Sequence, residues 1–387
     1  MPSDSDRILW AIRDLAPSLA ARADEIELAR TLPIDLVREL CSIGLFRMLV
    51  PRSHGGLEIE FPSSLDILTE LAAIDGALGW TVMIGSETPQ LLALLPRKAY
   101  DQIYSSDPDV ICAGAFAPQG TAQAVDGGYR VSGRWPFASG AGHAQWLFGR
   151  CVVVRDGKPV PGFAEGSPVT RCAVMPALRW EILDTWRTLG MRGTGSNDFA
   201  AKDAFVAEDW TFDLFFGEPC LKGPLFASSI LQFSMHIGAV ALGIAEAALR
   251  DLRALASTNK KRLYASSSLA DSTLFQYRLG HAEADAQAAR AFLAMRAQSY
   301  WQKALKDSVT MADGPQVLQT TGWVVETSAR VVDACYKAAG GSALYDSSPL
   351  QRRLRDIHTL TQHASTQEGV FATAGATQLG RQGPFGI

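Results

Sequence analysis

The sequence predicts an α+β fold in three consecutive parts: an N-terminal helical domain, a central antiparallel β domain and a C-terminal four-helix bundle. Apolar residues recur at helical spacing near the start of the chain and again towards its end, whereas the middle consists of short β-branched runs between Gly, Pro and Asp turns. With 387 residues the chain is also longer than one hydrophobic core usually serves. We place the domains at residues 1–110, 111–215 and 216–387 and expect the middle one to form a small β-barrel.

The N-terminal domain is predicted to be helical throughout. We expect its helices over residues 8–29, 33–43, 63–74, 79–95 and 96–104. The pair Thr88-Pro89 lies inside the fourth of these stretches. Because proline lacks an amide hydrogen and restricts the residue before it, we expect a bend at this point.

The spacing of apolar residues is typical of strands in the middle of the chain and of helices towards its end. The runs expected to form strands cover residues 110–116, 121–125, 128–132, 146–154, 171–175 and 201–206. Asp126-Gly127, between the second and third run, is a strong hairpin signal. Alanine-rich helices are expected over residues 226–257, 272–306, 315–339 and 349–375, and short turns between long helices predict a bundle.

Composition excludes several classes of function. A formal net charge of −4 gives no basic surface for nucleic acid or for an acidic membrane, so neither partner is expected. The six cysteines have no C-x-x-C spacing, the six histidines form no close cluster with cysteine or aspartate, and we therefore expect no metal site. The polar, acidic start of the chain does not resemble a signal peptide, and reduced thiols fit a cytoplasmic protein.

Common catalytic motifs are also missing from the sequence. It contains no G-x-x-x-x-G-K-[S/T] loop, no G-x-G-x-x-G after a strand and no G-x-S-x-G elbow. An organic cofactor is therefore the expected source of chemistry.

The segment at residues 133–146 is the main candidate for a binding loop. It reads Gly-Arg-Trp-Pro-Phe-Ala-Ser-Gly-Ala-Gly-His-Ala-Gln-Trp. Its small residues let a ligand approach the backbone, unpaired amides and the Ser139 hydroxyl can donate hydrogen bonds, and its aromatic rings can pack on a flat ligand. The alternative is a tight β-corner plugged by aromatic side chains.

Four motifs in this order resemble the acyl-CoA dehydrogenase superfamily. They are Trp135-Pro-Phe-Ala-Ser139, the run Leu-Gly-Met-Arg-Gly-Thr-Gly-Ser-Asn-Asp at 189–198, Gly340-Gly341-Ser342, and the segment 352–356. Within the superfamily the chain is similar to the flavin-dependent monooxygenases of two-component systems. That similarity depends on His143-Ala-Gln-Trp146 after the loop, the Gly-Thr-Gly-Ser turn at 193–196, and Arg355-Asp356-Ile-His358 followed by His363.

The resemblance implies a cofactor, partners and a reaction. The cofactor would be reduced FAD or FMN, supplied by a separate flavin reductase, and the substrates would be O₂ and a small aromatic molecule that is hydroxylated through a flavin C4a-hydroperoxide. The protein would be a homo-oligomer, a dimer or a tetramer.

The resemblance also implies roles for individual residues. His363 would be catalytic, placed near the flavin to hydrogen-bond the substrate or to help deprotonate it, and Ser139 with its adjacent amides would contact flavin N5. Trp135 and Phe137 would flank the flavin ring, with Ala138 beside them.

Further residues would bind the remainder of the ligands. Arg262 would lie against the flavin or its phosphate, often across a subunit interface, although a solvated charge run is the alternative. The turn Gly340, Gly341 and Ser342 would let the backbone approach the phosphate. Thr194 and Ser196 would touch flavin or substrate, with a plain β-turn as the alternative.

One departure separates the chain from true acyl-CoA dehydrogenases. Those enzymes place a catalytic Glu about eight residues after an Arg-Asp pair, where this sequence has Ala364, and Glu368-Gly369 comes four residues late. Without that carboxylate the oxidation of an acyl thioester lacks its base. Acyl-CoA oxidation, which would need Glu368, and a non-catalytic flavin-fold interaction protein are the two alternatives.

A second departure concerns the substrate. Phenol hydroxylases of this group carry a histidine eight residues after a Trp, and counting from Trp80 gives Thr88. Thr88 is thus a candidate substrate contact, but not a partner for a phenolate. Indole, or a derivative such as indole-3-acetate, is nucleophilic at C3 already and is therefore favoured over phenols.

Overall fold

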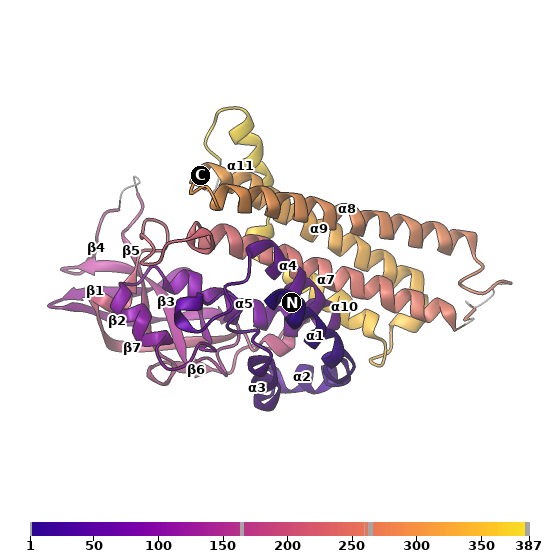
Figure 1. Cartoon of the computed structure of the whole chain (residues 1–387), viewed down its shortest axis with the longest axis horizontal. Coiled ribbons are helices and arrows are strands. Elements are labelled where there is room, and N and C mark those ends of the chain that lie inside the picture. The colour runs from indigo at the N-terminus through magenta and orange to yellow at the C-terminus, as the bar shows by residue number, and fades with distance from the viewer. Residues whose placement is uncertain (1, 163–165, 259, 262–265, 384–387) are drawn as a thin grey trace.

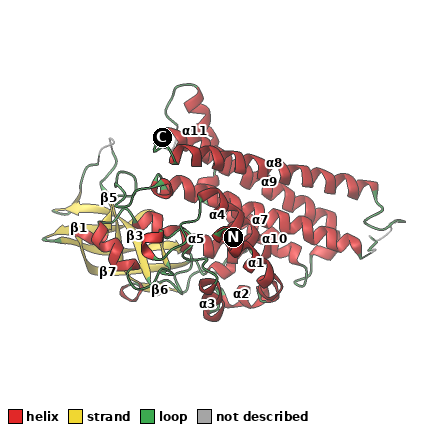
Figure 2. Cartoon of the chain, viewed as in Figure 1, coloured by secondary structure: helices red, strands yellow, loops and turns green. Residues whose placement is uncertain are grey.

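The computed structural model describes residues 2–162, 166–258, 260–261 and 266–383. It has the predicted order of an N-terminal helical domain, a central sheet and C-terminal helices (Figure 1). Figure 2 shows the sheet at one end of the molecule, with the long helices extending away from it. The predicted α+β fold is therefore confirmed.

The N-terminal domain contains six helices among the described residues. They are α1 (Asp4–Ala21), α2 (Ala23–Ala29), α3 (Ile34–Ser42), α4 (Phe61–Ile74), α5 (Gly76–Leu92) and α6 (Arg97–Tyr104). The prediction of one helix over 8–29 is wrong, because the chain leaves helical geometry at Arg22, with φ −93° and ψ 2°. The Arg22 guanidinium binds Glu25 and Asp35, each at 2.7 Å, which joins α2 to α3.

Helix α5 continues through Thr88-Pro89, where a bend was expected. Pro89 has no amide to donate to the carbonyl of Gly85, one turn earlier. The Thr88 hydroxyl donates to that carbonyl instead, at 3.1 Å. The Thr88 side chain therefore replaces the hydrogen bond that the proline removes, and the helix is kept to Leu92.

The central strands form one mixed sheet. They are β1 (Cys112–Val125), β2 (Gly128–Ala138), β3 (Trp146–Arg155), β4 (Lys158–Pro159), β5 (Thr170–Pro176), β6 (Glu181–Leu183), β7 (Asn197–Ala207) and β8 (Thr211–Phe212). The hairpin at Asp126-Gly127 is confirmed, since β1 and β2 pair antiparallel on either side of it. The described strands follow the order β6-β7-β2-β1-β3-β5-β8, with β4 on β3, so the ladder is open rather than closed into a β-barrel.

The expectation of a purely antiparallel sheet is corrected at one pair of strands. β3 runs parallel to β1, with Cys112 opposite Trp146. Strand β2 ends at the edge of the sheet where β1 begins, so the loop at residues 139–145 needs only to cross the start of β1 to begin β3. This short crossing fixes Ser139 at the edge of the sheet that faces the helices.

The C-terminal part is built on long helices. They are α7 (Ser229–Ser257), α8 (Thr273–Ala304), α9 (Gly314–Ala339), α10 (Pro349–Leu360) and α11 (Gly369–Gln378), and α7 packs against α4, α5, α8, α9 and α10. Helix α7 is long and apolar enough to cross a membrane by length and composition, but 83% of its most apolar stretch is buried in the fold.

The expected fourth helix over 349–375 is broken in the middle. His363 takes an extended conformation, with φ −67° and ψ 142°, and its Nδ1 accepts the Ser365 amide hydrogen at 3.2 Å. This side-chain cap begins a new turn at Ala364–Thr366. α10 ends at Leu360, and His363 begins the turn that separates it from α11.

A buried carboxyl group joins the three domains. Asp356 on α10 accepts the Met191 amide hydrogen at 2.6 Å, and its second oxygen lies close to Gly76 at the start of α5. Asp75 caps α5 by accepting the Leu78 amide hydrogen at 2.9 Å. Burial, with a contribution from the Asp75 charge, raises the pKa of Asp356 to about 7.

We expect Asp356→Asn to remove a pH dependence of stability while keeping the acceptor for Met191. The folded-state pKa lies above the ordinary value of 3.8, so the stability that this group contributes is fully present below that value and is lost as the pH rises through about 7. The wild-type free energy of unfolding should fall relative to that of the variant between about pH 5 and about pH 8. Urea denaturation across this range measures it, with the exposed Asp346→Asn as the control. Parallel pH curves for wild type and Asp356→Asn would contradict the assignment.

Candidate active site

Trp135 does not lie at the surface of the candidate loop. Its ring is fully buried in the sheet, stacks on Phe199 with ring centroids 5.5 Å apart, and donates from Nε1 to the Arg150 carbonyl at 2.6 Å. Added Cβ atoms at Gly120, Gly133 and Gly149 would collide with or crowd this indole, so the three glycines form the slot that holds it. Trp135 was expected to lie beside a flavin ring, but its side chain is instead part of the hydrophobic core of the sheet.

Phe137 instead presents its ring outwards. Alternation along a strand would put residues 135 and 137 on the same face. A register shift between Trp135 and Ala138 and a φ of +69° at Phe137 break that alternation, and 67% of Phe137 is exposed. Ala138 is fully buried, so only Phe137 of this pair offers a side chain to a flat ligand.

Ser139 begins a chain of buried hydroxyl groups. Its Oγ lies 3.0 Å from Trp80 Nε1 and 2.7 Å from Ser196 Oγ, which in turn lies 2.6 Å from Thr194 Oγ1. Thr194 Oγ1 donates to the Met191 carbonyl at 2.8 Å. Thr194, Ser196 and Ser139 are all buried.

The direction of this chain follows from the number of protons. Each hydroxyl has one hydrogen to donate. Because Thr194 donates to a carbonyl, it accepts from Ser196, Ser196 accepts from Ser139, and Ser139 accepts from the Trp80 indole. Ser139 Oγ therefore has a remaining lone pair but no free hydrogen.

The loop amides are less available than the sequence indicated. Those of Ser139, Gly140, Ala141 and His143 donate to backbone carbonyls. Both ring nitrogens of His143 are buried without a hydrogen-bond partner among the described residues. A ligand at this edge would thus meet side chains rather than a row of free amides.

His363 is brought to the same place from the far end of the sequence. Its ring centroid lies 5.6 Å from that of Trp80 and 5.7 Å from that of Phe233, and Phe233 lies 5.3 Å from Phe116. Four elements thus contribute aromatic side chains to one cluster: α5, α7, β1 and the turn after α10. Trp80 is shared, since its indole hydrogen reaches Ser139 while its ring meets His363.

The geometry at His363 fixes its tautomer. Nδ1 accepts the Ser365 amide hydrogen, so in the neutral ring the proton sits on Nε2, for which the described residues supply no partner. Burial lowers the pKa of His363 to about 4. The ring is therefore neutral near pH 7, with Nδ1 occupied by the Ser365 amide hydrogen and the Nε2 hydrogen available to donate.

The sequence pointed to Ser139, Thr194, Ser196 and His363 but not to Trp80, Phe116 or Phe233. These three aromatics occupy apolar helical or strand positions, which indicate only burial. Their grouping depends on contacts between distant segments. The one sequence signal was Trp80 itself, an aromatic side chain with a polar edge inside an apolar helix.

Several predicted contacts lie elsewhere. Thr88 uses its hydroxyl to replace the proline-blocked hydrogen bond of α5, so its predicted substrate contact is not supported. Arg262 lies outside the described residues. Gly340, Gly341 and Ser342 form a turn at the end of α9 that contacts α9 and α10, at the ends of the long helices away from the sheet (Figure 1). Glu368, which acyl-CoA oxidation would need, is exposed at the start of α11.

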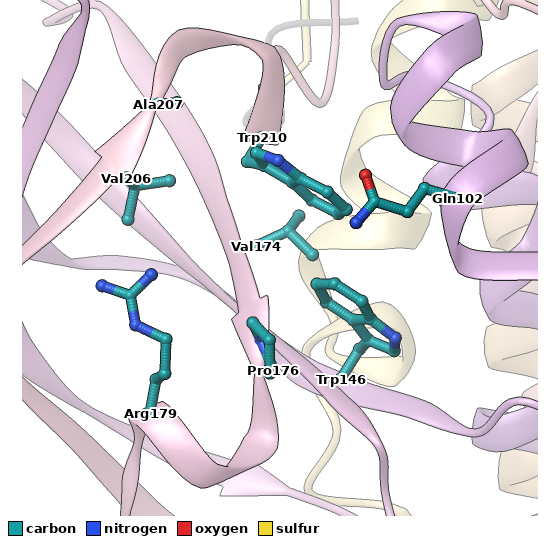
Figure 3. Close-up of a pocket in the computed structure, with 8 residues that line it drawn as sticks. All are labelled: Gln102, Trp146, Val174, Pro176, Arg179, Val206, Ala207 and Trp210. Atoms are coloured by element: carbon teal, nitrogen blue, oxygen red, sulfur yellow. The ribbon is translucent and has the colours of Figure 1, made fainter.

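A cavity of about 240 Å³ lies apart from these residues (Figure 3). It is lined by Gln102, Trp146, Val174, Pro176, Arg179, Val206, Ala207 and Trp210. The rings of Trp146 and Trp210 stack in it with centroids 4.8 Å apart. Trp146, the last residue of the candidate loop, therefore lines this cavity, and no member of the aromatic cluster around Trp80 and His363 does.

Comparison with known proteins agrees with the geometry. Residues 5–95 match the acyl-CoA dehydrogenase N-terminal domain, and residues 235–368 match the acyl-CoA dehydrogenase C-terminal domain. The chain is 32% identical over 379 residues to indole-3-acetate monooxygenase of Pseudomonas putida, covering 97% of this chain and 93% of that protein.

Two further relatives have solved structures. The flavin-dependent monooxygenase oxygenase subunit HsaA of Mycobacterium tuberculosis is 28% identical over 97% of this chain and 96% of its own length, and its crystal structure superposes with a TM-score of 0.87 over 98% of each chain. XiaF from Streptomyces, solved with FADH2 and glycerol, has a TM-score of 0.90 at 26% identity, covering 98% of this chain and 96% of its own. The chain therefore belongs to the flavin-dependent monooxygenases of the acyl-CoA dehydrogenase superfamily.

Proposed function

We propose that this protein is the oxygenase component of a two-component system that hydroxylates a small aromatic substrate, with indole or an indole derivative favoured over phenols. The proposal is supported by relatives named indole-3-acetate monooxygenase and monooxygenase oxygenase subunit, and by a neighbour bound to FADH2. A separate flavin reductase would supply reduced FAD or FMN. When bound, the reduced flavin supplies the electrons that activate O₂.

The observation that carries this proposal is the direction of the hydroxyl chain ending at Ser139. Reduced flavin has a hydrogen on N5 to donate, whereas N5 of oxidised flavin is an acceptor. Ser139 Oγ has a lone pair left and no hydrogen, because its proton goes to Ser196. The acceptor at the end of the hydroxyl chain thus matches the N5 hydrogen of reduced flavin. The exposed ring of Phe137 is the proposed contact for the flat isoalloxazine.

The aromatic cluster supplies the setting for the substrate. Trp80, Phe116 and Phe233 form an apolar wall next to His363, and such a wall excludes water from the reacting atoms. The His363 Nε2 hydrogen would donate to an oxygen atom of the reacting groups. Thr194 and Ser196 hold Ser139 in place and are proposed as supporting residues.

The assay for this function needs reduced flavin, O₂ and an aromatic panel. Purified protein mixed with chemically reduced FAD or FMN and then with ¹⁸O₂ should convert indole to a hydroxylated product that carries the label. Catalase is included, so that peroxide from free flavin cannot hydroxylate indole. Labelled product is expected only with the protein present. Absence of any labelled product from indoles and phenols would overturn the proposal, as would reduction of flavin by an acyl-CoA.

We expect His363→Ala to keep flavin binding but to reduce hydroxylation by roughly 10²-fold, because a donor to the reacting oxygen is lost. His363→Gln, which can present an N–H at a similar point, should recover part of the rate. Product formation from a fixed amount of pre-reduced flavin measures both variants, and a flavin titration is the control.

The same residue predicts a flat pH profile. The pKa of His363 is lowered to about 4, so its charge does not change above about pH 5.5. The hydroxylation rate should therefore show no inflection from this residue between about pH 5.5 and about pH 8. An inflection near the ordinary value of 6.5 that His363→Gln removes would contradict the donor role.

We also propose that the protein is a cytoplasmic homo-oligomer. The turn at Gly340–Ser342 lies away from the Ser139 site within one chain, so it could reach a flavin only in a second copy (Figure 1). Helix α8 carries exposed apolar side chains, among them Leu274, Tyr277 and Met295, which fit a covered face. Light scattering should give the mass of a dimer or tetramer, and a monomer would overturn this proposal.

A further inference from the structure

Glu87 is a buried carboxyl group that the proposed function does not use. It lies on α5, and only 8% of its side-chain surface is accessible. Its Oε2 lies 2.8 Å from Nδ1 of His236 on α7, and Nε2 of His236 lies 2.8 Å from the Ser64 hydroxyl on α4. The Ser64 hydroxyl also lies 2.7 Å from the Phe61 carbonyl. Helices α4, α5 and α7 pack side by side around this group (Figure 1).

Glu87 shares a face of α5 with Trp80. Seven residues are close to two helical turns, so the two side chains point in nearly the same direction, about 10 Å apart along the axis. Ile84, between them on this face, is half-buried, whereas Val82 and Ser86 on the other side of the helix are fully buried. The accessible surface of α5 therefore follows the Trp80 and Glu87 face.

Helix α7 repeats this arrangement. His236 lies three residues, or about one turn, after Phe233, whose ring contacts His363. Glu87 and His236 thus face each other along the same line between α5 and α7 on which Trp80, Phe233 and His363 meet.

One oxygen of Glu87 is left without a partner. The polar side chains of Trp80, Ser86, Thr88 and Gln90 on this helix all have hydrogen-bond partners. Oε2 of Glu87 is bound to His236, but Oε1 has no hydrogen-bond partner among the described residues. Oε1 is not fully enclosed, in agreement with the 8% of the Glu87 side-chain surface that is accessible.

The unpartnered oxygen is an acceptor. If Ser64 donates to the Phe61 carbonyl, His236 donates from Nε2 to Ser64, and Glu87 donates from Oε2 to Nδ1. If His236 carries a proton on Nδ1 as well as on Nε2, it is an imidazolium and Glu87 is a carboxylate. Burial raises the pKa of Glu87 and lowers that of His236 to about 3, which favours the neutral pair. In both arrangements Oε1 accepts.

We propose that Glu87 Oε1 accepts a hydrogen bond from an N–H or O–H of the aromatic substrate and selects substrates that carry such a donor, as the pyrrole N–H of indole does. His236 and Ser64 are positioning residues that hold Glu87. This assignment rests on the proposed function, since it places the substrate of that reaction between Trp80 and Glu87. A carboxylate at this point would face an acceptor, so indole fits better here than the acetate group of indole-3-acetate.

Equilibrium binding of indole and indene tests the assignment. Indene has the shape of indole but lacks the N–H. Binding is measured without O₂, with reduced flavin present, for wild type, Glu87→Gln and Glu87→Met. Wild type should prefer indole over indene by about tenfold or more, because indene leaves a buried acceptor unpaired. Glu87→Met should lower that ratio by about tenfold, and comparing ratios cancels the difference in hydrophobicity between the ligands.

Glu87→Gln keeps the folded pair and should keep the preference. Its amide can donate to His236 Nδ1 while its carbonyl oxygen still accepts from the ligand. Ser86→Ala, one residue away and about 100° around the axis of α5, is the matched control, because the Ser86 side chain is fully buried and bonded to the Met83 carbonyl, and it should leave the ratio unchanged. Thermal unfolding of each variant separates loss of the fold from loss of selection.

The outcomes separate this proposal from the proposed function. An unchanged indole-to-indene ratio in Glu87→Met, with the fold intact, overturns the role of Glu87 alone. Binding with the expected ratios but no labelled product in wild type overturns the hydroxylation and leaves the selection standing. If wild type binds neither ligand, the role of Glu87 in selecting indole is overturned, and the labelled-product assay with phenols alone decides the hydroxylation.

Discussion

The buried indole of Trp80 is the constraint on which the candidate site depends. Its N–H donates to Ser139 of the β domain, and its ring meets His363 of the C-terminal part, so one side chain of the N-terminal domain sets the distance between the other two. Its position is fixed by the start of α5. Asp75 caps that helix, and Asp356 lies against Gly76 while it also holds the Met191 amide. The positions of the site residues are therefore fixed by the packing of three domains and not by the conformation of a single loop.

The parts of the fold with a strong local signal were predictable. Long apolar periods predicted α7, α8 and α9 closely, and Asp126-Gly127 predicted its hairpin. The failures come where a side chain changes the path of the backbone. The His363 side chain caps a new turn inside the stretch expected to form the fourth helix, and the Thr88 hydroxyl lets α5 continue past Pro89 to Leu92. Neither effect appears in periodicity.

The candidate site was predictable only in part, for a related reason. Motif resemblance indicated Ser139 and His363, and the structure brings both to Trp80. It could not separate Trp135 from Phe137, because a register shift and a positive φ exchange the faces that strand alternation assigns. Phe116 and Phe233 read as ordinary core positions until the chain is folded. Glu87 was visible as a charge in an apolar helix, but its partner His236 is distant in sequence and gave no signal.

The hydrogen-bonding groups of the site constrain the chemistry of its substrate. Ser139 can only accept, since its proton is donated to Ser196, and the neutral ring of His363 offers its Nε2 hydrogen while Nδ1 already accepts the Ser365 amide hydrogen. A phenol reacts best after losing its proton, which needs a base beside it. Because His363 is fixed as a donor and Thr88 is bound to its own helix, these two residues supply no such base. A ring that is electron-rich without deprotonation, such as indole, needs none, so the acceptor at Ser139 and the donor at His363, the proposed cofactor and substrate contacts, are compatible with a neutral heteroaromatic substrate.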